Sequence, residues 1–130
     1  MVKRILCSIM MVAMLAFAAT YAAASARQSP SSGIVIGHAV EISTYAMKGL
    51  DAEHIEAMKF RSSNGFPVGI IEEETGKLYV CVYRNPAPAS GLETANEKLA
   101  PFLGLKVAAQ GLVYSAEGVN VIRLSIVTEY

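Results

Sequence analysis

The chain has 130 residues, of which 53% are hydrophobic and 17% are charged, so it has room for one domain and is too apolar to be disordered. Its 11 lysines and arginines balance its 11 aspartates and glutamates, which argues against a dedicated nucleic-acid-binding protein. Two cysteines and two histidines leave few ligands for a zinc or iron–sulfur centre. The only long apolar run lies at the N-terminus, which excludes a protein that crosses a membrane several times.

The N-terminal residues have the pattern of a secretory leader. Lys3 and Arg4 precede an uncharged apolar stretch, and small residues follow it. This order predicts a signal peptide over residues 1–26, cleaved after Ala26 or, alternatively, after Ala24. An uncleaved anchor is the other interpretation, since residues 5–26 are just long enough to span a bilayer. Export predicts a periplasmic or secreted protein that has no membrane association once the leader is removed.

Cleavage after Ala26 changes the charge and the cysteine count. About 104 residues remain, with a net charge of about −2. Cys7 is lost with the leader, so Cys81 has no partner for an internal disulfide. We therefore predict that Cys81 is a small packed side chain rather than a reactive thiol. A disulfide between two chains is the alternative, because the compartment is oxidising.

The first part of the mature chain predicts one strand and one helix. Residues 27–33 are rich in Ser, Pro and Gly, which predicts a flexible lead-in. Residues 34–45 alternate in polarity, which predicts a half-buried strand. Its apolar face is expected to carry Ile34, Ile36, His38, Val40 and Ile42. A helix is predicted over 51–61, with Asp51 as its N-cap.

The middle of the chain predicts a β-hairpin. Two strands are expected over 66–73 and 77–84, and Gly76 in the short connection can supply the positive φ that such turns need. One face of the second strand carries Tyr79, Cys81 and Tyr83.

The last part predicts a short helix and a second hairpin. The sequence Thr-Ala-Asn-Glu at 94–97 matches a capping box, and Pro101 limits the helix that follows. Strands are predicted over 105–114 and 119–127, and Gly111 marks a bulge or bend in the first of them. The apolar face of the final strand is expected to carry Ile122, Leu124 and Ile126.

The order strand, helix, hairpin, helix, hairpin predicts a mostly-β fold over residues 34–130. It matches a five-stranded OB-fold-like Greek-key barrel with two short helices. A glycine bend in a strand is what closure of such a barrel requires. The alternative is an open α+β sheet with its helices on one face.

Several short motifs follow one another in the mature chain. They are Gly-Phe-Pro-Val-Gly at 65–69, Thr-Gly-Lys-Leu-Tyr at 75–79, Leu-Ala-Pro-Phe at 99–102, and Gly-Leu-Lys-Val at 104–107 followed by Gly111. With these motifs the chain resembles a family of small secreted bacterial OB-fold-like proteins over residues 41–130. The resemblance implies an exported protein with this barrel.

The chain departs from that family at the positions that carry its chemistry. The family has an Asp and a Cys at the end of the first strand, where this chain has Ser43 and Ala46. Its helix carries a His and two Cys; His54 is retained, but Ala57 and Arg61 stand at the cysteine positions. A cluster of Cys and His could bind a soft or borderline metal. Because these thiols are missing here, we expect neither a metal nor another cofactor.

Three side chains are candidates for ligand binding. Tyr79 and Tyr83 share a strand face and could stack against the rings of bases or sugars, although the glutamates at 72–74 oppose a polyanion. The simpler alternative is two half-buried core tyrosines. His54 lies on the helix that flanks the usual ligand-binding face of an OB-fold, and its simpler alternative is an exposed helix histidine.

No motif for nucleophilic catalysis or phosphate binding occurs, so we expect no enzyme activity. The prediction is an exported binding or accessory domain, a monomer or weak dimer, whose partner is a protein or a small ligand and not nucleic acid. One alternative is a degenerate metal- or thiol-site protein, which requires His38 and His54 to converge. The other is an envelope structural or assembly protein that dimerises through an exposed strand edge.

Overall fold

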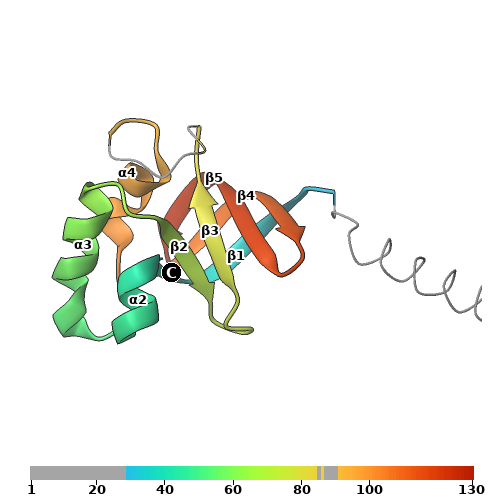
Figure 1. The fold of residues 1–130 in the computed structure, drawn as a ribbon. Helices are drawn as coiled ribbons and strands as arrows, with labels where there is room; N and C mark the ends of the chain where they lie inside the picture. Colours follow the sequence, from blue (N-terminus) through green and yellow to red (C-terminus); the bar gives the residue numbers. More distant parts are fainter. Residues whose placement is uncertain (1–28, 85, 87–90) are drawn as a thin grey trace, which may run out of the picture.

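Five strands close into a barrel in the computed structural model, which describes residues 29–84, 86 and 91–130 (Figure 1). Around the barrel the order is β1 (Ser31–Glu41), β2 (Val68–Glu72), β3 (Leu78–Val82), β5 (Val119–Glu129) and β4 (Lys106–Ala116), which returns to β1. Only β3 and β5 pair in parallel; the other neighbours are antiparallel. The predicted mostly-β, OB-fold-like barrel is confirmed, and the alternative of an open α+β sheet is wrong.

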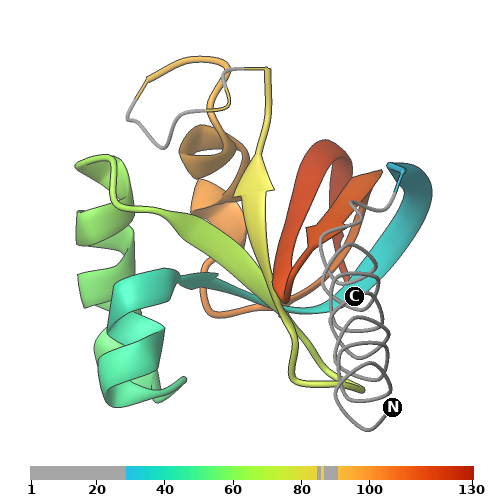
Figure 2. The same ribbon diagram turned by 45° about the vertical axis from the view of Figure 1, so that its right-hand side comes forward.

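The described residues hold three α-helices and two 3-10 turns, where the sequence predicted two helices. Between β1 and β2 lie α2 (Ile42–Lys48), η1 (Ala52–His54) and α3 (Ile55–Ser63), and between β3 and β4 lie α4 (Ala95–Leu99) and η2 (Ala100–Phe102). Figures 1 and 2 show α2 and α3 together on one side of the barrel, with the β4–β5 hairpin on the other.

The first strand differs from the prediction at both ends. β1 begins at Ser31, inside the segment expected to be a flexible lead-in, because Ser31–His38 pair with β4. It ends at Glu41, where α2 replaces the predicted end of the strand. The Glu41 carboxylate accepts hydrogen bonds from the backbone N–H groups of Ser43 and Thr44, both at 2.9 Å, and so provides the N-cap of α2.

The predicted inward face of β1 is wrong except at Val40, which is fully buried although it lies outside the barrel core cluster. Val35 and Ala39 are buried in the barrel core, whereas Ile34 is 64% exposed. The reason is the close approach of β1 to β2: a Cβ added at Gly37 would lie 1.9 Å from the Ile71 carbonyl oxygen. Gly37 shares the inner face with Val35 and Ala39, so this face needs a residue without a side chain at its centre, and the isoleucines lie on the opposite face.

The remaining predicted elements are confirmed with shifted ends. The β2–β3 connection has Gly76 at φ +71°, as a tight hairpin requires. The Thr94 hydroxyl accepts the Glu97 N–H at 3.2 Å and caps α4, as the capping-box sequence predicted. The Glu97 carboxylate in turn accepts the N–H of Glu93 at 3.0 Å, one residue before the position expected for a capping box.

A bulge is present beside the predicted glycine, but its extra residue belongs to β5, where Ser125 has no partner in β4. The register with β5 shifts between Gln110 and Gly111, and beyond the shift Ile126 lies opposite Gln110. The bulge therefore reverses the alternation of β5: Leu124 is buried, but Ile126 is 55% exposed. The prediction that Ile126 lies on the apolar face is wrong for this reason.

One hydrophobic core fills the barrel and extends under α4. Side chains from all five strands and from the α4–η2 region belong to it: Val35, Ala39, Val68, Ile70, Cys81, Ala95, Leu99, Leu103, Val107, Ala109, Ile122 and Leu124. The helix α4 is therefore part of the core, and the surfaces on either side of it are held in a fixed position.

The predicted signal peptide, residues 1–26, lies outside the described residues. Among the residues that are described, no helix has both the length and the apolar character needed to cross a membrane.

Candidate functional site

The two candidate tyrosines lie on β3 and at its C-terminal end, and both pack partly into the core. Tyr79 and Tyr83 are half-buried against the core cluster, on either side of the buried Cys81. Burial, and then the charge of Glu72, raise the pKa of Tyr79. This arrangement matches the alternative of half-buried core tyrosines and leaves no flat, exposed pair of rings.

Positive side chains gather around Tyr83. The Lys98 Nζ atom lies 4.9 Å from the centroid of the Tyr83 ring, and the guanidinium carbon of Arg84 lies 5.6 Å from it. The Arg123 Nε atom donates to the Tyr83 carbonyl oxygen at 3.4 Å. Cations over an aromatic face are attracted by its negative centre, so these contacts help to hold the cations in place.

Two hollows meet at Tyr83 and Arg84. One, of about 490 Å³, has Lys98 in its wall, and the other, of about 440 Å³, has Arg123. Arg84 is paired with Glu93 at 2.6 Å, and this hydrogen bond raises the pKa of the guanidinium further. Neither Lys98 nor Arg123 has a carboxylate within ion-pair distance in the part of the chain that is described. We call this area, defined by Tyr83, Arg84, Lys98 and Arg123, the Tyr83 surface.

A separate groove of about 320 Å³ lies between α3 and α4. Its lining is mostly apolar. The residues that line it are Lys59, Ser62, Ser63, Gly91, Leu92, Asn96, Glu97, Ala100 and Leu103. Because α3 and α4 come from two different connections of the barrel, only the folded chain brings these residues together.

Asn96 and Ser62 are the buried polar side chains that line this groove, and Asn96 has 4% of its surface exposed. Its Nδ2 atom donates to the carbonyl oxygens of Ser62 at 2.8 Å and Phe66 at 2.7 Å, which ties α4 to the end of α3. Its Oδ1 atom is buried and has no hydrogen-bond partner among the described residues. A buried acceptor without a donor costs about 1–3 kcal/mol. The sequence analysis gave Asn96 no role of its own, because it stands between the capping residues Thr94 and Glu97.

A second polar network, also missed from the sequence, surrounds Glu41. The carboxylate accepts the Ser43 hydroxyl at 2.6 Å and the Thr44 hydroxyl, in addition to their backbone N–H groups. Arg61 on α3 donates to the Ser43 hydroxyl at 3.0 Å. Burial on its own raises the pKa of Glu41, but the four hydrogen bonds outweigh it and hold that pKa below its ordinary value. The network joins β1, α2 and α3.

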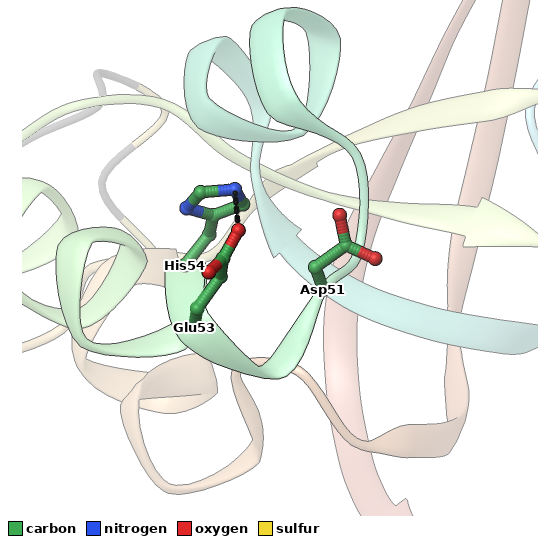
Figure 3. Close-up of side chains that lie close together, drawn as sticks. All are labelled: Asp51, Glu53 and His54. Carbon is green, nitrogen blue, oxygen red and sulfur yellow. Dashed lines mark ion pairs between the residues drawn. The ribbon is translucent and has the colours of Figure 1, made fainter.

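His54, the third candidate, lies in a small polar cluster just before α3. Asp51, Glu53 and His54 each offer a ligand atom, and these atoms lie within 4.8 Å of one another. Figure 3 shows the Glu53 carboxylate against the imidazole of His54, where the Nε2–Oε1 distance is 3.2 Å. Asp51 holds the predicted N-cap position, here that of η1, but its side chain makes no capping hydrogen bond. Both carboxylates are exposed, so water solvates this cluster.

His38 is not part of that cluster. It lies on β1 opposite Ile71 and Lys106, half-buried on the outer side of the barrel. Its charge acts instead on Glu73, whose pKa is lowered first by the hydrogen bond from Lys106 and to a smaller extent by His38. The alternative of a degenerate metal site required the two histidines to converge on one metal ion. In the described residues, the cluster of possible metal ligands contains His54 but not His38.

Cys81 is a packed core residue, as the sequence predicted. It is buried and forms no disulfide within the described residues. Its Sγ atom lies 3.8 Å from the Tyr79 carbonyl oxygen. Burial raises the pKa of the thiol, so the thiolate that would be needed for reaction is disfavoured.

The resemblance to small secreted bacterial OB-fold-like proteins rests on sequence motifs. Two of these motifs, at 65–69 and 75–79, fall on β2, on β3 and on the residues that flank them. Of the other motif residues, Ala100 lines the α3–α4 groove and Gly111 lines the hollow that holds Arg123. No family model, no curated protein and no solved structure matches this chain.

Proposed function

We propose that the protein is an exported binding domain that takes a small anionic ligand at the Tyr83 surface. The single observation that supports this most is the position of Lys98 and Arg123. Both flank Tyr83, each lines one of two adjoining hollows, and neither is paired with a carboxylate of the described residues. Cations that are held by neighbouring groups and are free of acidic partners favour binding of carboxylate or phosphate groups.

A small ligand fits this surface better than a polyanion does. Arg84 is already neutralised by Glu93, and Glu97 also lines the first hollow, so the excess of positive charge is small. A nucleic acid needs a continuous basic track along its phosphates. A ligand with one or two anionic groups needs only Lys98 and Arg123, which have no carboxylate partner in the described part of the chain. The proposal therefore keeps the expectation that nucleic acid is not the partner.

The proposal assigns no catalytic step to the protein. The Cys81 thiol is buried, and His54 is paired with an exposed glutamate rather than with a nucleophile. The alternative of an assembly protein that dimerises through a strand edge is less favoured, because the strands of the described chain close into a barrel.

Pyrophosphate is a suitable probe for the Tyr83 surface. We expect it to shift the amide resonances of the residues around Tyr83 in two-dimensional NMR of the purified protein. Lys98→Gln and Arg123→Gln should each weaken its binding by about tenfold, since each removes one charge-assisted hydrogen bond. Lys77→Gln is the matched control, because Lys77 is an exposed lysine on the β2–β3 hairpin, away from the surface.

Two results would contradict the proposal. One is the absence of any shift around Tyr83 at millimolar pyrophosphate; the other is an equal loss of binding in the Lys77→Gln control. The export half of the proposal is tested separately by the mass of the protein recovered outside the cytoplasm. The expected N-terminus is Arg27, or Ser25 if cleavage follows Ala24, and a chain that retains Met1 contradicts export.

A further inference from the structure

The α3–α4 groove is separate from the Tyr83 surface and differs from it in chemistry. The helix α4 lies between the two, and only Leu92 and Glu97 line both the groove and the neighbouring hollow. The body of the groove is lined by Leu92, Ala100 and Leu103, together with serines at the end of α3. Its volume of about 320 Å³ lies at the small end of the range for ligand pockets.

The orientation of the Asn96 amide is fixed by its partners. Carbonyl oxygens only accept hydrogen bonds, so the atom that faces the carbonyls of Ser62 and Phe66 has to be Nδ2, the donor. Among the residues that the structure describes, the atom left without a partner is therefore Oδ1, an acceptor. Buried side-chain oxygens are normally paired, and an unpaired one calls for an explanation.

We propose that the groove binds a small, largely apolar molecule that carries an N–H or O–H donor, and that a small movement of the groove wall on binding lets this donor pair with Oδ1 of Asn96, which is covered in this structure. The apolar body of the ligand packs against Leu92, Ala100 and Leu103. An anion is disfavoured, because Oδ1 is an acceptor, Glu97 lies in the wall, and the lysine of the wall, Lys59, is paired with Glu56 at 2.9 Å. The ligand class is thus different from that of the Tyr83 surface, and the inference does not depend on the function proposed above.

Indole tests this directly, with N-methylindole as its matched analogue. Indole has an apolar ring system and one N–H donor, and N-methylindole lacks only the donor. In two-dimensional NMR of the purified protein, indole should shift the resonances of Ser63, Leu92 and the Asn96 side-chain amide. N-methylindole should bind about tenfold more weakly, because it leaves the acceptor unpaired.

Variants locate the binding. Ala100→Phe fills the groove from an exposed position and should abolish the indole shifts. Ala52→Phe is the control, since Ala52 is an exposed alanine in η1 that does not line the groove. If Ala100→Phe does not fold, as judged by loss of resonance dispersion, Ser63→Trp blocks the groove from the α3 side instead.

The proposal is overturned if indole and N-methylindole bind equally well, because the acceptor then plays no part in recognition. It is also overturned if the shifts map to the barrel core or if both blocking variants bind indole normally. Saturating pyrophosphate should leave the affinity for indole unchanged within about twofold. If pyrophosphate fails to bind at the Tyr83 surface, the proposal for the groove is therefore unaffected. If indole fails to bind in the groove, the proposal for the Tyr83 surface is likewise unaffected.

Discussion

The buried carboxylate of Glu41 determines where β1 ends and α2 begins. The residues after it include Ile42 and Thr44, which are β-branched and favour a strand, so their own preference opposes the helix. Four hydrogen bonds to one carboxylate overcome this preference. Glutamate is also an uncommon N-cap, because shorter side chains reach the first N–H groups more easily. The sequence pattern therefore gave no sign of α2.

Replacing Glu41 by Gln should lower stability and change its pH dependence. An amide has one acceptor where the carboxylate has two, so we expect a loss of about 2–3 kcal/mol at neutral pH. The folded pKa of Glu41 lies below its ordinary value of 4.5. The contribution of the carboxylate is therefore complete above that value and is lost as the pH falls through the folded pKa.

Urea unfolding over a series of pH values measures both effects. The parent chain should lose stability steeply below about pH 4.5, and Glu41→Gln should show a smaller loss over the same range. Glu74→Gln, at an exposed hairpin position, is the control and should change stability by less than about 0.5 kcal/mol. Equal acid dependence in the parent and in Glu41→Gln would show that the network does not stabilise the fold through this charge.

At the scale of elements, the strands were largely predictable and the inward faces were not. Alternation of apolar residues located β1, and the glycine-containing connection located the β2–β3 hairpin. In β1, however, Ile34 and Ile36 are larger than Val35 and Ala39, and the pattern favoured the larger residues for the interior. The deciding factor is the distance between neighbouring strands, which a one-dimensional pattern does not contain.

Two glycines lie opposite each other in β1 and β4, and replacing each by alanine is predicted to have a different effect on stability. Gly33 pairs with Gly111 in the β1–β4 ladder. A Cβ at Gly111 would lie 2.0 Å from the Arg123 carbonyl oxygen, whereas a Cβ at Gly33 would lie 3.4 Å from a Val113 methyl group, an ordinary contact. We expect Gly111→Ala to cost about 3 kcal/mol or more, since the backbone of β5 has to move.

The matched variant Gly33→Ala should be neutral within about 0.5 kcal/mol, because it adds a methyl group without a clash. Chemical denaturation of the two variants and the parent chain measures the difference. Similar stability for both variants would mean that β4 can accommodate a side chain at Gly111, opposite the bulge of β5. The bulge would then not depend on glycine.

At the scale of the whole molecule, the barrel was predictable but its surfaces were not. The order of strands and helices restricts the topology to very few closed arrangements, and the OB-like order is one of them. Of the three candidate site residues, Tyr83 lines the two hollows of the proposed binding surface. Tyr79 packs against the core, and His54 lies in a solvated cluster. Lys98, Arg123 and Asn96 come together only through the tertiary fold, so local spacing could not identify them.

The single core of the described chain makes Cys81 a reporter of global unfolding. Its thiol is enclosed by the barrel, so a labelling reagent reaches it only when the core opens. In a Cys7→Ser chain, which leaves Cys81 as the one remaining cysteine of the sequence, labelling at neutral pH should be at least about a thousandfold slower than in the urea-unfolded chain. Combining this change with Gly111→Ala should speed up labelling, and combining it with Gly33→Ala should not. Labelling of the native chain at nearly the unfolded rate would mean that the β3 region opens without the rest of the barrel.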